Sequence, residues 1–194
     1  VITMDGQGDW GVHHTSGIFR DGRYEREHTS DDDGTSAGMF YALITELLGF
    51  RPMRHEGKVV GLAAMGDPQL LYKDFHAALR LSADGLTLAS EFVGDQAEAR
   101  RLNHLKAAIA GHSRENISAA AQLVLEDVAL DLVRNYLKKT GLKRLALNGG
   151  VFANVAQTIF DGGRLASQVR AQKAATDGAF AAYKQSVLGA LEDV

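Results

Sequence analysis

Apolar and polar positions follow two different rhythms along the chain. Over the first 28 residues, apolar side chains occur in short runs separated by two turns that contain glycine, at residues 5–9 and 21–22. Short apolar runs bounded by Gly and Asp are typical of strands joined by hairpins. The pattern therefore predicts a three-stranded antiparallel meander at the start of the chain.

Helical spacing takes over after a polar loop at residues 29–35. Residues 35–48 carry apolar side chains three and four positions apart and are followed by Gly49, a natural helix stop. The same reasoning predicts a short strand at residues 86–89 and helices at residues 69–80, 96–110, about 113–139 and 164–191. The apolar stripe of the longest helix, which includes Ile117, Val124 and Leu132, is expected to be core and not a cofactor contact.

Residues 145–154 are the stretch around which the chain is organised. A short apolar run leads into Gly149 and Gly150, and the segment that follows can turn helical. Glycine allows the backbone to approach a flat ligand closely, and N–H groups at a helix start suit phosphate or ribose oxygens. An ordinary strand-to-helix turn has the same pattern, so this stretch alone does not decide between the two.

The order of elements indicates the fold class. A meander followed by alternating helices and strands predicts an α/β fold, with a mixed sheet that begins with the antiparallel meander and is flanked by helices. This is the order of one RNase-H-like lobe of an actin-like nucleotide-binding fold. We expect residues 1–194 to form one such lobe. Because the chain starts in the middle of a predicted strand, we also expect it to be a fragment of a longer protein.

Composition excludes several classes of function. A net charge of −3 gives no electrostatic case for a nucleic-acid partner or a membrane surface. The chain has no cysteine, which excludes disulfides, thiolate metal sites and a thiol nucleophile. No apolar run is long enough to span a membrane, and no signal peptide is evident, so a cytoplasmic location is expected.

Two polar stretches are candidates for chemistry. In the first turn, the backbone of Gly6 and Gly8 is suited to cradling a phosphate, and the carboxylates of Asp5 and Asp9 to holding Mg²⁺ through water. The alternative is a plain polar hairpin. In the second stretch, four ionisable residues crowd before an apolar segment at a predicted helix start: Arg54, His55, Glu56 and Lys58. They serve either a site or ordinary ion pairs.

Three stretches together resemble the ATP-dependent O-carbamoyltransferases, a family whose members carbamoylate nodulation factors, cephalosporins and aminoglycosides. They are Met4-Asp5-Gly6-Gln7-Gly8-Asp9, the block from Gly38-Met39-Phe40-Tyr41 through Leu48-Gly49-Phe50 to Glu56-Gly57-Lys58-Val59-Val60-Gly61-Leu62-Ala63, and Gly149-Gly150-Val151-Phe152-Ala153-Asn154-Val155. They occur in the family's order over residues 1–155. The related tRNA threonylcarbamoyl-transferases share the fold and the last block, but they do not normally carry Glu-Gly-Lys.

The resemblance implies a mechanism and a set of ligands. In the family, carbamoyl phosphate and ATP give a carbamoyl adenylate in a separate domain, and the actin-like domain presents it with a metal ion, Fe or Mg, to the hydroxyl of a small-molecule acceptor. By resemblance, the nucleotide- and phosphate-binding residues are Asp5, Gly6, Gly8, Asp9, Glu56, Lys58, Gly149, Gly150 and Asn154. Asp177 is the candidate metal ligand. No catalytic residue is assigned.

Two departures from the family pattern limit this reading. The family's upstream His-x-x-x-His metal motif is not in this sequence, and Ala156-Gln157 stand where the family has Leu-Asn. The isolated chain is therefore expected to be inactive without the remaining domains of the parent protein. Two alternatives stay open: an actin-like nucleotide-binding module without transferase activity, and a tRNA threonylcarbamoyl-transferase relative, which the missing basic patch disfavours.

Overall fold

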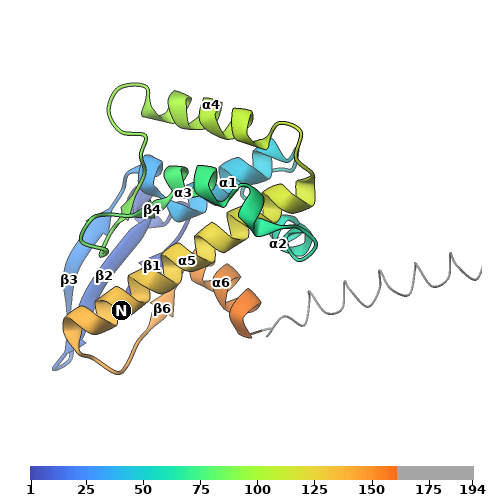
Figure 1. The fold of residues 1–194 in the computed structure, drawn as a ribbon. Coiled ribbons are helices and arrows are strands. Elements are labelled where there is room, and N and C mark those ends of the chain that lie inside the picture. Colours follow the sequence, from blue (N-terminus) through green and yellow to red (C-terminus); the bar gives the residue numbers. More distant parts are fainter. Residues whose placement is uncertain (161–194) are drawn as a thin grey trace, which may run out of the picture.

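The computed structural model describes residues 1–160 of the chain (Figure 1). Within them, a four-stranded sheet in the order β3-β2-β1-β6 and a two-stranded ribbon, β4-β5, are combined with helices. The mixed α/β class predicted from the sequence is confirmed. The finer assignment to an actin-like lobe stays a prediction, as does the extent of the lobe. The predicted helix at residues 164–191 lies outside the described residues.

The predicted antiparallel meander is confirmed. β1 (Ile2–Met4) pairs with β2 (His14–Arg20), which pairs with β3 (Arg23–Ser30), both antiparallel. Asp21 and Gly22, at φ 49° and 77°, form the two-residue turn between β2 and β3. Two left-handed residues in succession match the right-handed twist of a hairpin. The longer connection from β1 to β2 contains a short 3₁₀ turn, η1 (Asp9–Gly11).

β1 has a second neighbour that comes from the far end of the described chain. β6 (Leu147–Asn148) runs parallel to it, with Ile2 opposite Leu147 and Thr3 opposite Asn148. The carboxyl ends of β1 and β6 therefore lie at the same edge of the sheet. The turns that follow these two strands are the two glycine-bearing stretches singled out in the sequence.

The helices predicted at residues 35–48, 96–110 and about 113–139 are confirmed. The principal helices of the structure are α1 (Ala37–Leu47), α2 (Glu56–Ala63), α3 (Tyr72–Ala78), α4 (Ala97–Ile109), α5 (Arg114–Thr140) and α6 (Gly150–Phe160). Gly49 and Gly141 follow α1 and α5 with positive φ, as expected of helix stops. η2 (Asp33–Thr35) leads into α1.

The prediction of one helix over residues 69–80 was wrong. Leu71, at φ −125°, separates η3 (Pro68–Leu70) from α3. Beyond α3, β4 (Arg80–Leu81) pairs with β5 (Leu88–Ala89) instead of continuing the helix. The Ser82 hydroxyl donates to the Thr87 carbonyl and accepts from its N–H, which closes this ribbon locally.

The helix α5 organises the core. It runs across the sheet in Figure 1, with α1 and α3 above it and α6 beneath. Its predicted stripe is buried, which confirms its role as core: Ile117, Ala121, Val124, Val128, Leu132 and Tyr136. The Ser16 hydroxyl of β2 donates to the Tyr136 hydroxyl near the end of α5. The sheet contributes Ile2 and Met4, both buried.

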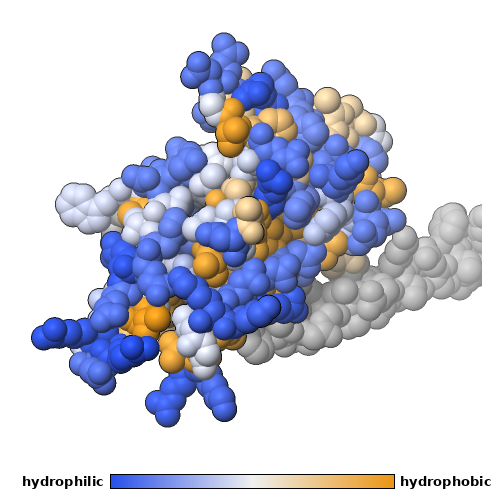
Figure 2. Space-filling model, turned by 60° about the vertical axis from the view of Figure 1, so that its left-hand side comes forward, coloured by the Kyte–Doolittle hydropathy of each residue, from blue (hydrophilic) through white to orange (hydrophobic). Residues whose placement is uncertain are grey.

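The surface carries no extended apolar area on the face drawn in Figure 2. Hydrophobic side chains form small separate groups there among hydrophilic ones. In the part of the chain that the structure describes, no helix combines the length and the apolar character needed to cross a membrane.

Candidate nucleotide cavity

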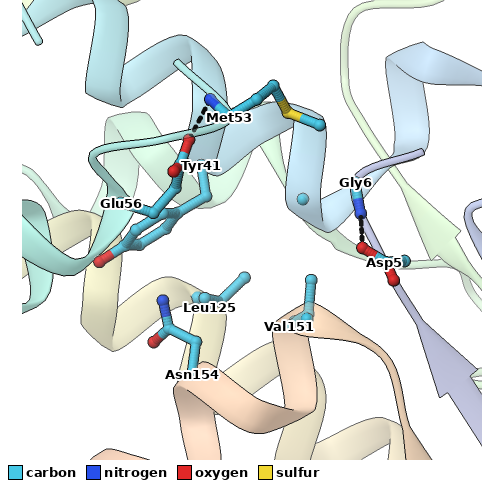
Figure 3. Close-up of a pocket in the computed structure, with 10 residues that line it drawn as sticks. Asp5, Gly6, Tyr41, Met53, Glu56, Leu125, Val151 and Asn154 are labelled. Atoms are coloured by element: carbon cyan, nitrogen blue, oxygen red, sulfur yellow. Dashed lines mark hydrogen bonds between the residues drawn. The ribbon is translucent and has the colours of Figure 1, made fainter. Parts of the chain in front are cut away.

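A cavity of about 290 Å³ lies where β1 and β6 end. Figure 3 shows residues from the first turn, α1, α2, α5 and α6 around it. Its lining residues are Asp5, Gly6, Gly38, Tyr41, Met53, Glu56, Leu125, Gly150, Val151 and Asn154. Crevices outside the carboxyl ends of neighbouring parallel strands are the usual ligand sites of α/β sheets, and this volume suits a small molecule. The structure thus brings together stretches about 145 residues apart.

The first turn lies directly against the start of α1. A Cβ built at Gly38 would be 2.3 Å from both Cα and N of Gly6, so only glycine fits there. Ser36, the N-cap of α1, accepts from the Met39 N–H at 3.1 Å, and its hydroxyl is 3.2 Å from the Gly6 carbonyl oxygen. This packing fixes one wall of the cavity in backbone.

The two glycines after β6 have different roles. Gly149 has φ +105°, and a Cβ there would be 2.1 Å from the Met4 carbonyl oxygen, so it is needed for the turn to pack against β1. Gly150 begins α6 without a positive φ, and a Cβ there would meet only the Asp5 carboxylate, at 3.2 Å. From the sequence, we expected that Gly149 and Gly150 could both adopt a positive φ to let a ligand approach. Only Gly149 has a positive φ, and there it allows the turn to pack against β1. Gly150 lines the first cavity.

Asp5 opens the first turn and faces the start of α6. Its Oδ1 accepts from the Gly6 N–H at 2.7 Å and faces the position of a Gly150 side chain. A carboxylate beside the start of a helix is stabilised by the N–H groups exposed there. Anything anionic that enters at this point meets both those N–H groups and the Asp5 carboxylate.

Glu56 and Lys58 separate on α2. Glu56 lines the cavity, and its Oε1 accepts from the Met53 N–H at 2.5 Å. Lys58 is exposed, with its ammonium 5.4 Å from the centre of the Phe50 ring. Glu56 lines this cavity and Lys58 does not, because residues two apart on a helix point in widely different directions. A role of Lys58 in nucleotide binding stays a prediction.

Polar side chains from three helices close one end of the cavity. The Tyr41 hydroxyl donates to Gln122 Oε1 at 2.7 Å, and Gln122 Nε2 lies 3.2 Å from Asn154 Oδ1 and 2.7 Å from Glu126 Oε1. Burial raises the pKa of Tyr41 well above its ordinary value of 10, so the phenol keeps its proton and acts as a donor.

A second cavity of about 440 Å³ also borders the first turn. It is lined by Thr3, Asp5, Gly8, Trp10, Val12, His13, Thr15, Arg26, Asn148 and Gly149. Asp5 therefore reaches both cavities, whereas Gly8 and Gly149 reach only the second. Asp9 opens η1. His13 lies with Nδ1 against the Gly6 carbonyl and Nε2 at 2.7 Å from Asp33 Oδ1, which anchors the turn from behind.

Asp177, the candidate metal ligand, lies outside the described residues. Within residues 1–160, no three His, Cys, Asp or Glu side chains are grouped as metal ligands would be.

Sequence reasoning missed Gln122. It treated α5 as a core helix only, and Gln122 sits on it with 5% of its surface exposed. A glutamine inside an apolar helical stripe was the available signal, because buried amides require hydrogen-bond partners. Tyr41 belonged to a quoted motif but was not assigned to the site.

These features define a mixed α/β domain with a small-molecule cavity at the carboxyl ends of two parallel strands. Comparison with known families identifies the family to which this domain belongs. The chain is a member of the family described as carbamoyltransferase N-terminus, whose model matches residues 1–170. The family predicted from the three motifs is confirmed.

Relatives span archaea and bacteria. The protein MJ1058 of Methanocaldococcus jannaschii is 30% identical over 82% of this chain and 28% of its own length. The nodulation protein NolO of Bradyrhizobium diazoefficiens is 30% identical over 79% of the chain and 28% of its own length. The nodulation protein NolNO of Sinorhizobium fredii is 29% identical over 79% of this chain and 22% of its own length. The chain thus spans about a quarter of these relatives.

Proposed function

We propose that the chain supplies the nucleotide-binding lobe of an ATP-dependent O-carbamoyltransferase. The reaction is transfer of a carbamoyl group from carbamoyl adenylate, made from carbamoyl phosphate and ATP, to a hydroxyl of a small-molecule acceptor. The observation that carries the proposal is the cavity in which the first turn meets the start of α6. Membership of the carbamoyltransferase family supports the chemistry.

The residues of the cavity fit an adenine nucleoside. Met53, Leu125 and Val151 offer apolar surface to a flat base. Tyr41 and Asn154 bring hydrogen-bonding groups to one end, while the Glu56 carboxylate is an acceptor suited to ribose hydroxyls. A volume of about 290 Å³ is at the lower limit for small-molecule sites and fits a nucleoside better than a larger ligand.

The start of α6 fits the phosphate of an adenylate. Backbone N–H groups in the first turn of a helix bind phosphate oxygens, and Gly150 leaves the space in front of them open. The Asp5 carboxylate would repel a phosphate there, and a divalent cation, Mg²⁺ or Fe²⁺, relieves such repulsion. Asp5 is thus a candidate ligand to such a cation, together with Asp177 outside the described residues.

The adenylate supplies an activated carbamoyl group, and the residues of this chain bind and orient it. In the proposal, Glu56 and the polar end hold the nucleoside, and the N–H groups of α6 oppose the charge that develops on the leaving phosphate. The close contact of Gly38 with Gly6 seals one side against water. The partners are carbamoyl phosphate, the acceptor alcohol and the remaining domains of the full protein, with no nucleic acid or membrane.

The test is a calorimetric titration of the 194-residue chain with a non-hydrolysable carbamoyl adenylate analogue, AMP and GMP. We expect the analogue to bind more tightly than AMP, and GMP to bind weakly. Gly150→Val should weaken binding at least tenfold, because its side chain enters the cavity beside Asp5, whereas Lys58→Ala should bind as the unmodified chain does. Equal affinity for AMP and the analogue would favour a plain nucleotide-binding module, and no binding of either would refute the proposal.

A further inference from the structure

We propose that Gln122 is a positioning residue of the nucleoside cavity: it fixes the Asn154 amide so that its nitrogen side, and not its oxygen, faces Tyr41 and the cavity. The inference rests on the proposed function for its ligand. The fixed orientation of the Asn154 amide, called the lock below, rests only on hydrogen bonds among the side chains of Tyr41, Gln122, Glu126 and Asn154.

The direction of the lock is set by Glu126. An ionised carboxylate only accepts hydrogen bonds, so the Gln122 atom 2.7 Å from Glu126 Oε1 must be the Nε2 donor. Reversing the Gln122 amide would place its oxygen against this carboxylate. Gln122 Oε1 therefore points the other way, to the Tyr41 hydroxyl at 2.7 Å, and Tyr41 must donate to it.

The same amide then determines the orientation of Asn154. Gln122 Nε2 also lies 3.2 Å from Asn154, and a donor there requires the Asn154 atom to be its oxygen. The Asn154 nitrogen is therefore left on the other side of the amide, away from Gln122. Figure 3 shows this nitrogen turned towards Tyr41.

The result is a connected set of donors and acceptors centred on Gln122. Tyr41 donates to Gln122, and Gln122 donates to both Asn154 and Glu126, so Gln122 links the other three side chains. The three come from α1, α5 and α6, and Tyr41 and Gln122 are 2% and 5% exposed. A ligand that reaches this end of the cavity meets an N–H edge, which selects for an acceptor such as a ring nitrogen or a ribose oxygen.

The test exchanges two residues. Gln122→Glu alone puts a second carboxylate beside Glu126 and removes the donor to Asn154. We expect it to lower the melting temperature and to weaken nucleoside binding about tenfold or more. The double variant Gln122→Glu with Glu126→Gln restores a donor–acceptor pair and the net charge. In the double variant, the Asn154 amide must still rotate so that its nitrogen faces residue 122, because a glutamate there only accepts hydrogen bonds.

Two readouts separate positioning from structure. In the double variant, we expect the melting temperature to recover and affinity for adenosine to stay about tenfold low. The Asn154 side-chain amide resonances, assigned through their loss in Asn154→Asp, should shift. Recovery of affinity together with stability, or unshifted resonances, would overturn the inference. If the unmodified chain binds no nucleoside, the proposed function fails, and the resonances alone decide for or against the lock.

Discussion

Replacing Gly149 by alanine should destabilise the whole fold. Gly149 has φ +105°, where a side chain is strained, and its added Cβ would be 2.1 Å from the carbonyl oxygen and 2.7 Å from the carbonyl carbon of Met4. Both atoms belong to the backbone of β1, the strand between β2 and β6. They cannot rotate away as a flexible side chain would, so either β1 or the start of α6 must move.

Two costs add. A non-glycine residue in a sparsely populated conformation costs about 1–3 kcal/mol, and forcing extra volume into a packed site costs about 1–3 kcal/mol more. The expected loss is therefore about 2–6 kcal/mol, a large part of the ~5–15 kcal/mol that stabilises a typical domain. For a chain of this size, the melting temperature should fall by roughly 5–20 °C.

The assay is urea and thermal unfolding of the 194-residue chain, and the neighbouring glycine is the matched control. Gly150→Ala meets only the Asp5 carboxylate at 3.2 Å and lies in helical backbone, so its stability should change by less than about 1 kcal/mol. A Gly149→Ala variant as stable as Gly150→Ala would refute the assignment of the strained contact to Gly149. It would also remove the packing argument for the β6–α6 turn.

Three further predictions follow from other contacts. Burial, and secondarily the charge of His28, lowers the pKa of His14 from 6.5 to about 4. The unfolded state therefore binds a proton that the folded state does not, and the free energy of unfolding should fall by about 1.4 kcal/mol per pH unit as the pH falls from 6.5 towards 4. His14→Gln should flatten this slope in urea unfolding measured across that pH range. Ser36→Ala removes the cap of α1 and its contacts to the first turn, and should cost about 1–2 kcal/mol of unfolding free energy. The chain incubated with ATP, carbamoyl phosphate, Mg²⁺ or Fe²⁺ and polyhydroxylated acceptors should give no carbamoylated product by mass spectrometry; turnover would contradict the view that further domains are needed.

Local pattern predicted the elements well wherever their partners are close in the chain. The meander and the helices α1, α4 and α5 follow from alternation, helical spacing and glycine stops. The prediction of a helix over residues 69–80 failed at Arg80, which pairs with Ala89 in the β4–β5 ribbon instead. Helical spacing within residues 69–80 carries no information about this partner, which lies beyond a turn. The pairing of β1 with β6 depends on a contact across about 145 residues, and no local signal encodes it.

The site was predictable in part. Asp5, Gly6, Gly150 and Asn154 were expected at a nucleotide site and line one cavity, although ligand binding there stays a prediction. Lys58 could have been set apart from Glu56 by the sequence alone, because two residues along a helix are rotated by about 200°. The role of Gln122 depends on three helices meeting, which only the tertiary structure shows.

The parallel pairing of β1 with β6 has a consequence for biosynthesis. At about 5–20 residues per second, β1 leaves the ribosome on the order of 10–30 s before β6 is made, and until then one edge of β1 lacks its strand. Its length of three residues limits mispairing during that interval, since short edges are poor templates for other chains. The cavity is complete only once residues 150–154 have been made, so the proposed nucleoside would stabilise only chains that have reached this length.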